Sequence, residues 1–401
     1  MNKGIKLHWL LIGVFLVNFG NSFVWPLTTV YIHDQLHHSL TVAGVVILFY
    51  SGANVVGSYF AGNSFDRHNP QYLMLSGLIG AIVTMLIMVF ENGWPMYPIM
   101  LTLVGFFNGW LVTLHNSYGT MTNNADGRFV FNMIYFANNL GMVCATSAVG
   151  PLYQWTHKQV GPLFLLTVIL YAFFSVLVFF FYRVPASARS QAHVDKTPAA
   201  GSKSSQLKLP HANSSIIWTL SISLCIVWIL YTQWSSNLSV YLTGMGMTMT
   251  NYSMLWTING LMVVFLQPLM NVVNRYVKHD YLKIYIGVMT IGLSFVTLIV
   301  GRVYLWFVAG MVVLTLGEIL VFPTIPAIIN QLSPNEVKGH FQGILNALIS
   351  LGKAIGPVFG GIMIEQTSYR LLFDLCLVSL IVIVVVTALM INRMKNKTVE
   401  Y

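Results

Sequence analysis

Twelve long apolar segments, separated by short polar breaks, constrain this chain of 401 residues more than any other feature. A helix needs about 20 predominantly apolar residues to cross a bilayer. The segments are 7–32, 40–61, 72–90, 96–121, 129–155 and 161–182 in the first half, and 214–242, 248–272, 281–301, 303–330, 340–364 and 370–392 in the second. The pattern predicts a polytopic membrane protein with twelve transmembrane helices.

The scarcity of charge excludes most soluble classes of protein. Only 8% of the residues are charged and 56% are hydrophobic, whereas a soluble globular chain carries about 25% charged residues. A soluble enzyme, a secreted disulfide scaffold and a disordered protein are all poor interpretations. The three cysteines, Cys144, Cys225 and Cys376, lie in apolar segments without metal-ligand or disulfide spacing. We therefore expect neither an enzyme nor a metal site.

One hydrophilic stretch divides the chain. Residues 184–213 are rich in Ser, Ala, Pro and Lys, which predicts a linker between two bundles. We expect a six-helix bundle at 1–183, a cytoplasmic linker at 184–213, a second six-helix bundle at 214–392 and a cytoplasmic tail at 393–401. Sixteen of the 20 Lys and Arg residues fall on the linker's side of the twelve segments, so the positive-inside rule places both termini in the cytoplasm.

Polar side chains are unevenly spread over the segments. Asn, Gln, His, Glu and Lys occur in two of every three, while the third, sixth, ninth and twelfth contain almost none. Eight helices around a wet cavity and four outside would give this pattern. Sparse matches between the halves, such as Gly150-Pro151 with Gly356-Pro357, support two pseudo-symmetric bundles. We expect an all-α membrane protein with two such six-helix bundles around a central cavity.

Two motifs add a family resemblance. After the second segment, Gly62 precedes the pair Asp66-Arg67 with the spacing G-x-x-x-D-R, and the eleventh segment reads G-x-x-x-G-P-x-x-G-G through Gly352, Gly356, Pro357, Gly360 and Gly361. In both motifs the chain resembles the major facilitator superfamily, and in particular its twelve-helix drug/proton antiporters. The resemblance implies that Gly62, Asp66 and Arg67 form a conformational latch and that the glycine motif packs helices.

Two ionisable residues lie deep in the second half. Glu318 is near the centre of the tenth segment, where a charged carboxylate is costly, so it can hold a proton in one conformation and release it in another. The alternative is a structural carboxyl group hydrogen-bonded between helices. Lys353 lies equally deep in the eleventh segment. It either forms a permanent buried pair with Glu318 or a pair that breaks when substrate or proton arrives.

A set of amide, aromatic and histidine side chains is the candidate lining of a substrate cavity. Such side chains carry no fixed charge and suit a broad amphipathic ligand. The alternative is that the amides only join helix to helix. The set is Asn18, Asn21, Trp25, His115, Asn116, Tyr135, Asn139, Trp234, Asn237, Trp256 and Asn259.

The sequence therefore predicts a monomeric secondary active transporter of the plasma membrane. It would export lipophilic drugs or other small molecules by alternating access, with the proton gradient as energy source and without a cofactor. Its partners would be a small-molecule substrate, protons and the lipid bilayer, and no nucleic acid. Two alternatives stay open: a permease for uptake or exchange of a small nutrient or organic anion, whose charge Lys353 would bind, and a non-transporting membrane sensor.

Overall fold

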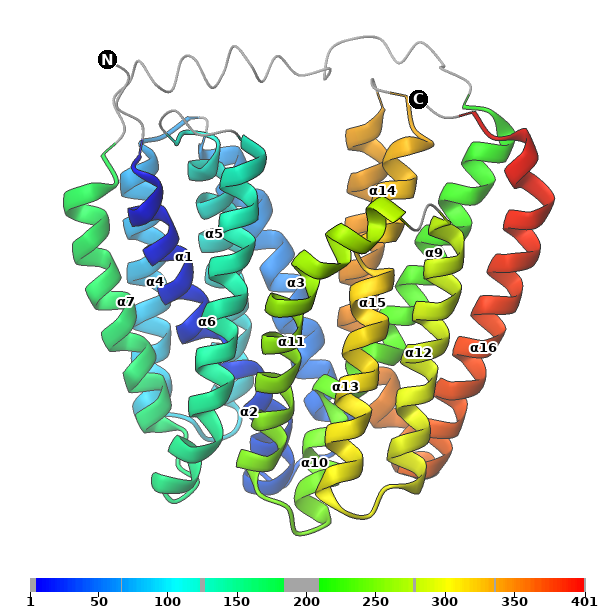
Figure 1. Cartoon of the computed structure of the whole chain (residues 1–401). Coiled ribbons are helices and arrows are strands. Elements are labelled where there is room, and N and C mark those ends of the chain that lie inside the picture. The colour runs from blue at the N-terminus through cyan, green and yellow to red at the C-terminus, as the bar shows by residue number, and fades with distance from the viewer. Residues whose placement is uncertain are drawn as a thin grey trace. The chain divides into compact units, whose positions relative to one another are not determined.

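The apolar segments form helices in the computed structural model (Figure 1). Backbone groups that face hydrocarbon must be hydrogen-bonded within the chain, and a helix achieves this locally. The structure describes residues 5–65, 67–122, 127–183, 209–276, 279–334 and 337–399, and at positions 25, 26, 127, 128, 267–276 and 339 it describes the backbone alone. Residues 184–208 of the predicted linker lie outside this description.

The helices follow the predicted segments in chain order. In the first half they are α1 (Leu7–Asn21), α2 (Val24–Val30), η1 (Tyr31–Gln35), α3 (Leu40–Phe65), α4 (Pro70–Phe90), α5 (Met96–Gly119), α6 (Gly127–Trp155) and α7 (Gly161–Phe181). In the second half they are α9 (His211–Ser235), α10 (Asn237–Gly244), α11 (Met249–Tyr276), α12 (Asp280–Val300), α13 (Tyr304–Val321), α14 (Thr324–Gln331), α15 (Lys338–Gln366), α16 (Tyr369–Met394) and η2 (Lys395–Lys397).

The all-α fold class is confirmed, because every named element in the described ranges is a helix. Ten helical stretches among those residues are long and apolar enough to cross a membrane. The first segment is split into shorter helices, of which α1 has 15 residues, and the more polar α11 is not one of the ten. The count of twelve crossings and the pseudo-symmetry of the two halves therefore stay predictions.

Three predicted segments contain a break that their hydropathy did not indicate. The breaks separate α1 from α2, α9 from α10, and α13 from α14. The third occurs at Phe322-Pro323, where proline has no backbone N–H to continue a helix. Asn18 and Glu318 each lie in the last turn before a break, and their carbonyls accept from the N–H groups of Ser22 at 2.9 Å and Phe322 at 3.1 Å. The breaks thus place polar side chains beside irregular backbone.

The chain divides into two compact units. Unit 1 comprises Met1–His38, Val45–Thr197 and Leu242–Gly260, and unit 2 comprises Ser39–Gly44, Pro198–Tyr241 and Leu261–Tyr401. Hence α3 and α11 each contribute residues to both units. The domain boundaries predicted from the sequence stay a prediction.

Each unit has its own packed interior. In unit 1, α1 packs on α6 and α7, while α4 packs on α5 and α7 (Figure 1). Apolar side chains fill this interior, among them Leu10, Leu78 and Phe174, each with 0% of its surface exposed. In unit 2, α9 packs on α15, and α12 packs on both α13 and α16. Glu318 lies on α13 and Lys353 on α15, so these pairings place both charged residues within unit 2.

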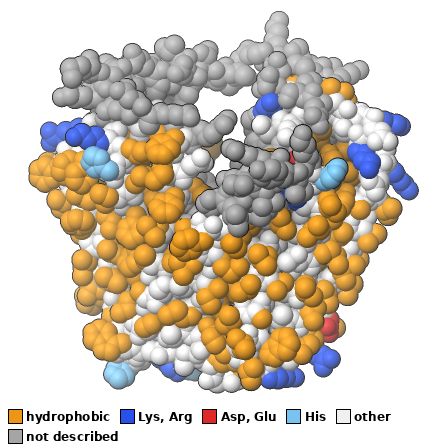
Figure 2. Space-filling model, viewed as in Figure 1, with side chains coloured by type: hydrophobic (Ala, Val, Ile, Leu, Met, Phe, Trp, Pro, Cys, Tyr) orange, Lys and Arg blue, Asp and Glu red, His pale blue; other side chains and the backbone are white. Residues whose placement is uncertain are grey.

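Apolar side chains also cover the outside. Figure 2 shows them over most of the visible face, with Lys and Arg near its upper and lower edges. Large hydrophobic residues are strongly exposed, for example Phe90 at 78% and Leu305 at 73%. An apolar surface of this extent needs a hydrocarbon solvent. The outer surface is therefore that of a protein embedded in a bilayer.

Candidate functional site

Glycines bring the backbone of α15 close to α9. A Cβ atom on Gly352 would lie 2.5 Å from the carbonyl oxygen of Cys225 and 2.9 Å from Cβ of Trp228, and one on Gly356 would lie 2.7 Å from the carbonyl oxygen of Ile229. Larger residues cannot occupy this face without moving the helices apart. The predicted packing motif thus lies at a helix–helix contact, and its members Gly352, Gly356 and Gly360 form what we call the glycine face of α15.

A side-chain amide locks the same contact. Gln233 on α9 donates from Nε2 to the carbonyl oxygen of Gly356 at 2.9 Å, and its Oε1 accepts from Nδ2 of Asn237 at 2.7 Å. Both residues are buried. The predicted cavity residue Asn237 therefore makes its described hydrogen bond within the wall of unit 2.

Glu318 is hydrogen-bonded inside unit 2. It lies in the last turn of α13, partly buried, and its Oε2 accepts from the hydroxyl group of Tyr231 on α9 at 2.9 Å. A hydrogen bond to a charged group is worth about 1.5–3 kcal/mol. The Tyr231 hydroxyl is thus a neutral partner that an embedded acid can use.

Aromatic rings surround this hydrogen bond. The rings of Trp228 and Phe322 stack with centroids 4.4 Å apart at 18°. Tyr231 meets both edge-on, with centroids 5.0 Å from Trp228 and 5.4 Å from Phe322. The carboxylate of Glu318 therefore adjoins an aromatic group built from α9 and the break after α13.

Lys353 completes the group. Its Nζ atom lies 4.0 Å from the ring centroid of Trp228, a cation–π distance. The carboxylate of Glu318, when ionised, attracts this ammonium. The two charges predicted to lie in mid-membrane are thus brought together. We call Trp228, Tyr231, Glu318, Phe322 and Lys353 the acid–aromatic cluster.

Trp228, Tyr231 and Phe322 were not predicted from the sequence as site residues. On an apolar helix, an aromatic side chain looks like ordinary core. The spacing of three residues between Trp228 and Tyr231 puts them on one face of α9, which was a usable signal. This spacing does not predict how α9 is aligned with α13 and α15.

In the first half, amides join the helices. Asn18 donates from Nδ2 to the carbonyl oxygen of Val14 at 3.0 Å and also to Oδ1 of Asn138 on α6. Asn21 accepts from the hydroxyl of Tyr50 on α3 at 3.3 Å, and that hydroxyl accepts from Nδ2 of Asn108 on α5 at 3.2 Å. These contacts match the alternative that amides join helix to helix. Tyr50 was missed because a phenol in an apolar segment carries no polar pattern.

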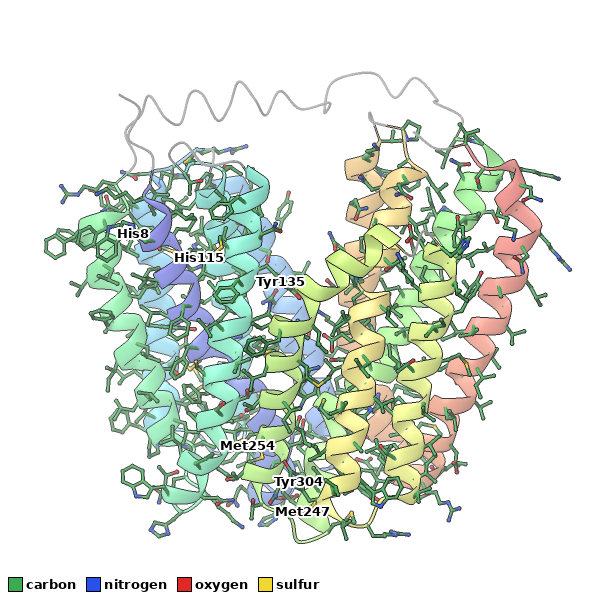
Figure 3. All side chains as sticks on the ribbon, in the orientation of Figure 1. His8, His115, Tyr135, Met247, Met254 and Tyr304 are labelled. Atoms are coloured by element: carbon green, nitrogen blue, oxygen red, sulfur yellow. The ribbon has the colours of Figure 1, made fainter. Side chains whose placement is uncertain are left out.

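The remaining first-half candidates differ in exposure. His115 is 2% exposed inside unit 1 and stacks on Phe174 with ring centroids 5.5 Å apart (Figure 3). Tyr135 is 54% exposed, and Asn139 donates to its carbonyl oxygen at 2.8 Å on the same helix. Asn116 is exposed. His115 thus lies in packed core, whereas Tyr135 and Asn116 are accessible within their unit.

The second-half candidates on α9 and α11 are buried. Trp234 is fully buried against Phe295 of α12, with ring centroids 6.4 Å apart. Trp256 is 4% exposed and Asn259 is 2% exposed. Contact with a substrate at these positions stays a prediction.

Part of the predicted latch can be placed. Gly62 lies in α3, and Arg67 is exposed in the turn that follows, where its N–H donates to the carbonyl oxygen of Ser64 at 3.1 Å. Asp66 and the side chain of Trp25 lie outside the described residues. The latch therefore stays a prediction.

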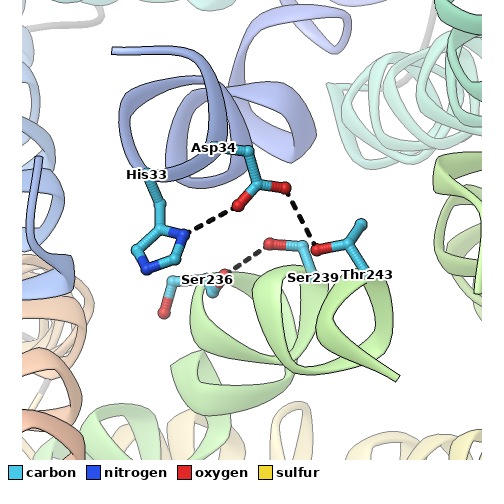
Figure 4. A network of polar contacts seen from close by, with 5 residues as sticks. All are labelled: His33, Asp34, Ser236, Ser239 and Thr243. Atoms are coloured by element: carbon cyan, nitrogen blue, oxygen red, sulfur yellow. Dashed lines mark hydrogen bonds and ion pairs between the residues drawn. The ribbon is translucent and has the colours of Figure 1, made fainter. Parts of the chain in front are cut away.

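Two carboxylates outside the cluster bind helix ends. Asp34 accepts from the hydroxyl of Thr243 at 3.2 Å and lies 2.7 Å from Nδ1 of His33, while the hydroxyl of Ser239 donates to the carbonyl oxygen of Ser236 at 2.7 Å (Figure 4). None of these contacts was predicted.

The second carboxylate is Glu365 at the end of α15. It accepts from both the backbone N–H and the hydroxyl of Thr41, each at 2.7 Å. Thr41 is the second residue of α3, so Glu365 caps the N-terminus of that helix, where a negative charge is favourable. No group of three or more His, Cys, Asp or Glu side chains in the described ranges is arranged to hold a metal ion.

Comparison with known proteins gives a family for this chain. The model of the Major Facilitator Superfamily matches residues 10–346 and 278–400. YttB of Bacillus subtilis (strain 168), described as an uncharacterized MFS-type transporter, is 34% identical over 99% of this chain and 97% of its own length. YqjV of the same organism, described in the same words, is 23% identical over 91% of this chain and 88% of its own.

Solved structures share the fold. A peptide transporter of the POT family has a TM-score of 0.78 at 13% identity, over 98% of this chain and 95% of that one. A POT family transporter in complex with 5-aminolevulinic acid has a TM-score of 0.76 at 15% identity, over 97% and 96%. The family match and the relative at 34% identity show that this chain belongs to the major facilitator superfamily, as a multi-pass membrane transporter and not an enzyme.

Proposed function

We propose that this transporter exports lipophilic small molecules from the cell by alternating access, driven by protons that bind and leave Glu318. The observation that carries the proposal is the hydrogen bond of 2.9 Å from Tyr231 to a carboxylate within an apolar helix. A charged carboxylate in such surroundings is costly, so its protonation is linked to any conformational change that alters them. We also propose that the protein acts as a monomer in the plasma membrane, with both termini in the cytoplasm.

The neighbouring ammonium supports this role. When Glu318 is ionised, it attracts the ammonium of Lys353 in the same cluster, and when a proton binds, that attraction is lost. Two charge states with different interactions are what a coupled transporter needs, because a ligand shifts an equilibrium only through differential interaction with its states. The amides of the first half supply no such switch, since they do not titrate.

The test is transport by reconstituted protein. Proteoliposomes with an imposed pH gradient are loaded with ethidium, Nile red or fluorescein, so that a cationic, a neutral and an anionic dye are compared. In the Glu318→Gln variant, gradient-driven transport should fall at least about tenfold, while exchange of dye without a gradient continues. Asp374→Asn, which removes the carboxylate of α16, is the matched control and should transport normally.

Full gradient-driven transport by folded Glu318→Gln would overturn the proton site. Absence of flux for every dye, together with tolerance of apolar replacements in the cluster, would instead favour a membrane sensor.

A second candidate function is a permease for a small organic anion or nutrient. Two observations favour it: the ammonium of Lys353 lies over the ring of Trp228 and could bind a carboxylate, and a fold neighbour was solved with 5-aminolevulinic acid. Competition separates the two candidates. A permease should be inhibited by small carboxylates and not by lipophilic dyes.

A further inference from the structure

We propose that Lys353 is a built-in cation that occupies the aromatic face of the acid–aromatic cluster and thereby restricts substrates to lipophilic molecules without a fixed positive charge. The inference deepens the proposed function, since it rests on substrate binding at this cluster. It names the class of substrate that the cluster accepts and the residue that decides it.

The cluster has the chemistry of a cation site. The face of an indole ring is the best aromatic surface for a cation, and a carboxylate nearby adds direct attraction. Trp228 and Glu318 supply both groups on neighbouring helices. An organic cation entering an empty site of this composition would be bound by the ring and the acid together.

That position is already filled. The Nζ atom of Lys353 lies 4.0 Å from the Trp228 centroid, and an ionised Glu318 attracts it there. The indole ring also stacks on Phe322 at 4.4 Å and meets the ring of Tyr231 edge-on at 5.0 Å. A second cation would therefore have to displace the ammonium or accept its repulsion at close range.

Backbone packing fixes the position of Lys353 along α15 relative to α9. Lys353 directly follows Gly352, whose added Cβ would lie 2.9 Å from Cβ of Trp228. Three residues later, the carbonyl of Gly356 accepts the hydrogen bond from Gln233 at 2.9 Å. The register of α15 on α9 is thus set on both sides of Lys353, so helix packing fixes the backbone position from which its side chain reaches Trp228.

The charges of the cluster determine whether it prefers a cationic, a neutral or an anionic ligand. With Glu318 ionised, the cluster carries one negative and one positive charge. With Glu318 protonated, only the ammonium remains charged. Neither state attracts a permanent cation, whereas the protonated state attracts an anion and both tolerate a neutral ligand.

The experiment compares two ions of the same shape and opposite charge. Tetraphenylphosphonium and tetraphenylborate are titrated onto the full-length protein in lipid nanodiscs, with empty nanodiscs measured in parallel to subtract partition into lipid. The wild-type protein should bind tetraphenylborate about tenfold or more tightly than tetraphenylphosphonium, which is the size expected of a desolvated cation–π contact.

Two variants isolate the ammonium. Lys353→Met keeps most of the side-chain length without the charge, and its affinity for tetraphenylphosphonium should rise about tenfold while that for tetraphenylborate falls. Lys353→Arg keeps the cation and should retain the preference for tetraphenylborate over tetraphenylphosphonium that Lys353→Met loses. If Lys353→Met does not fold, Lys353→Gln replaces it, because only a variant separates the effect of Lys353 from that of the other basic residues of the chain.

Equal binding of both ions to the wild-type protein, or a ratio that Lys353→Met leaves unchanged, overturns the inference. Because binding is measured without a pH gradient, this result is independent of the Glu318→Gln transport assay. If the protein does not prefer tetraphenylborate but Glu318→Gln loses transport as expected, only the selectivity role of Lys353 is ruled out. The expected ratio with unimpaired Glu318→Gln removes only the proton site.

Discussion

The two halves of the chain satisfy their interior polar groups in different ways. In the first half, Asn18 bonds to Asn138, and Tyr50 bridges Asn21 and Asn108, so these contacts join neutral groups. In the second half, a carboxylate and an ammonium share the acid–aromatic cluster. Amide and phenol groups such as these stay uncharged near neutral pH, whereas a carboxylate can gain or lose a proton. The contacts of the first half therefore do not titrate, and the energy coupling that we propose rests on the second half.

The largest effect beyond the Glu318 substitution itself is expected at Tyr231. Tyr231→Phe removes the hydroxyl that donates to Glu318 and keeps the ring contacts with Trp228 and Phe322. We expect gradient-driven transport to fall by about tenfold, since a hydrogen bond to a charged group is worth about 1.5–3 kcal/mol. Initial rates in proteoliposomes measure this. Tyr50→Phe removes the equivalent hydroxyl in the first half and should leave coupling intact; equal losses in both would erase the contrast between the halves.

A smaller effect on stability is expected at Asn138. Asn138→Ala removes the interhelical contact with Asn18, whose amide keeps its bond to the carbonyl of Val14 at 3.0 Å. Because an interhelical hydrogen bond in a membrane protein is worth about 0.6–1.7 kcal/mol, the midpoint of thermal unfolding in detergent should fall moderately. The fall should be the same at pH 5.5 and pH 8. A loss that depends on pH would show that the first half also contains a titrating contact.

The smallest effect is expected at Glu365. Glu365→Gln keeps an oxygen for Thr41 but removes the negative charge at the start of α3. At an exposed position this charge contributes about 0.5 kcal/mol, and the contribution should disappear in high salt. Unfolding of the variant at low and high salt measures it. A large loss of transport would instead place a functional charge outside the cluster.

Hydropathy predicted where nearly all the helices lie, because each apolar segment must satisfy its own backbone. It did not predict the breaks at Ser22 or at Phe322-Pro323, since apolarity continues across them. The depth of Glu318 and Lys353 likewise followed from counting along their segments. Their common cluster did not, because it depends on how α13 and α15 are rotated against α9. Trp234 illustrates this: it was predicted as a cavity residue together with Asn237, and nothing in the sequence indicated that its ring packs on Phe295.

The glycine face of α15 has a consequence for motion. The glycine face lets α15 contact α9 backbone to backbone. The side-chain amide of Gln233 on α9 also donates a hydrogen bond to the backbone of α15. The pair α9 and α15 should therefore travel as one piece, carrying Trp228, Tyr231 and Lys353 together. A rearrangement of the cluster would then have to move Glu318 and Phe322, which lie at the end of α13 where the helix is interrupted. During transport, Glu318 would therefore move relative to Trp228, Tyr231 and Lys353, which would keep their positions relative to one another.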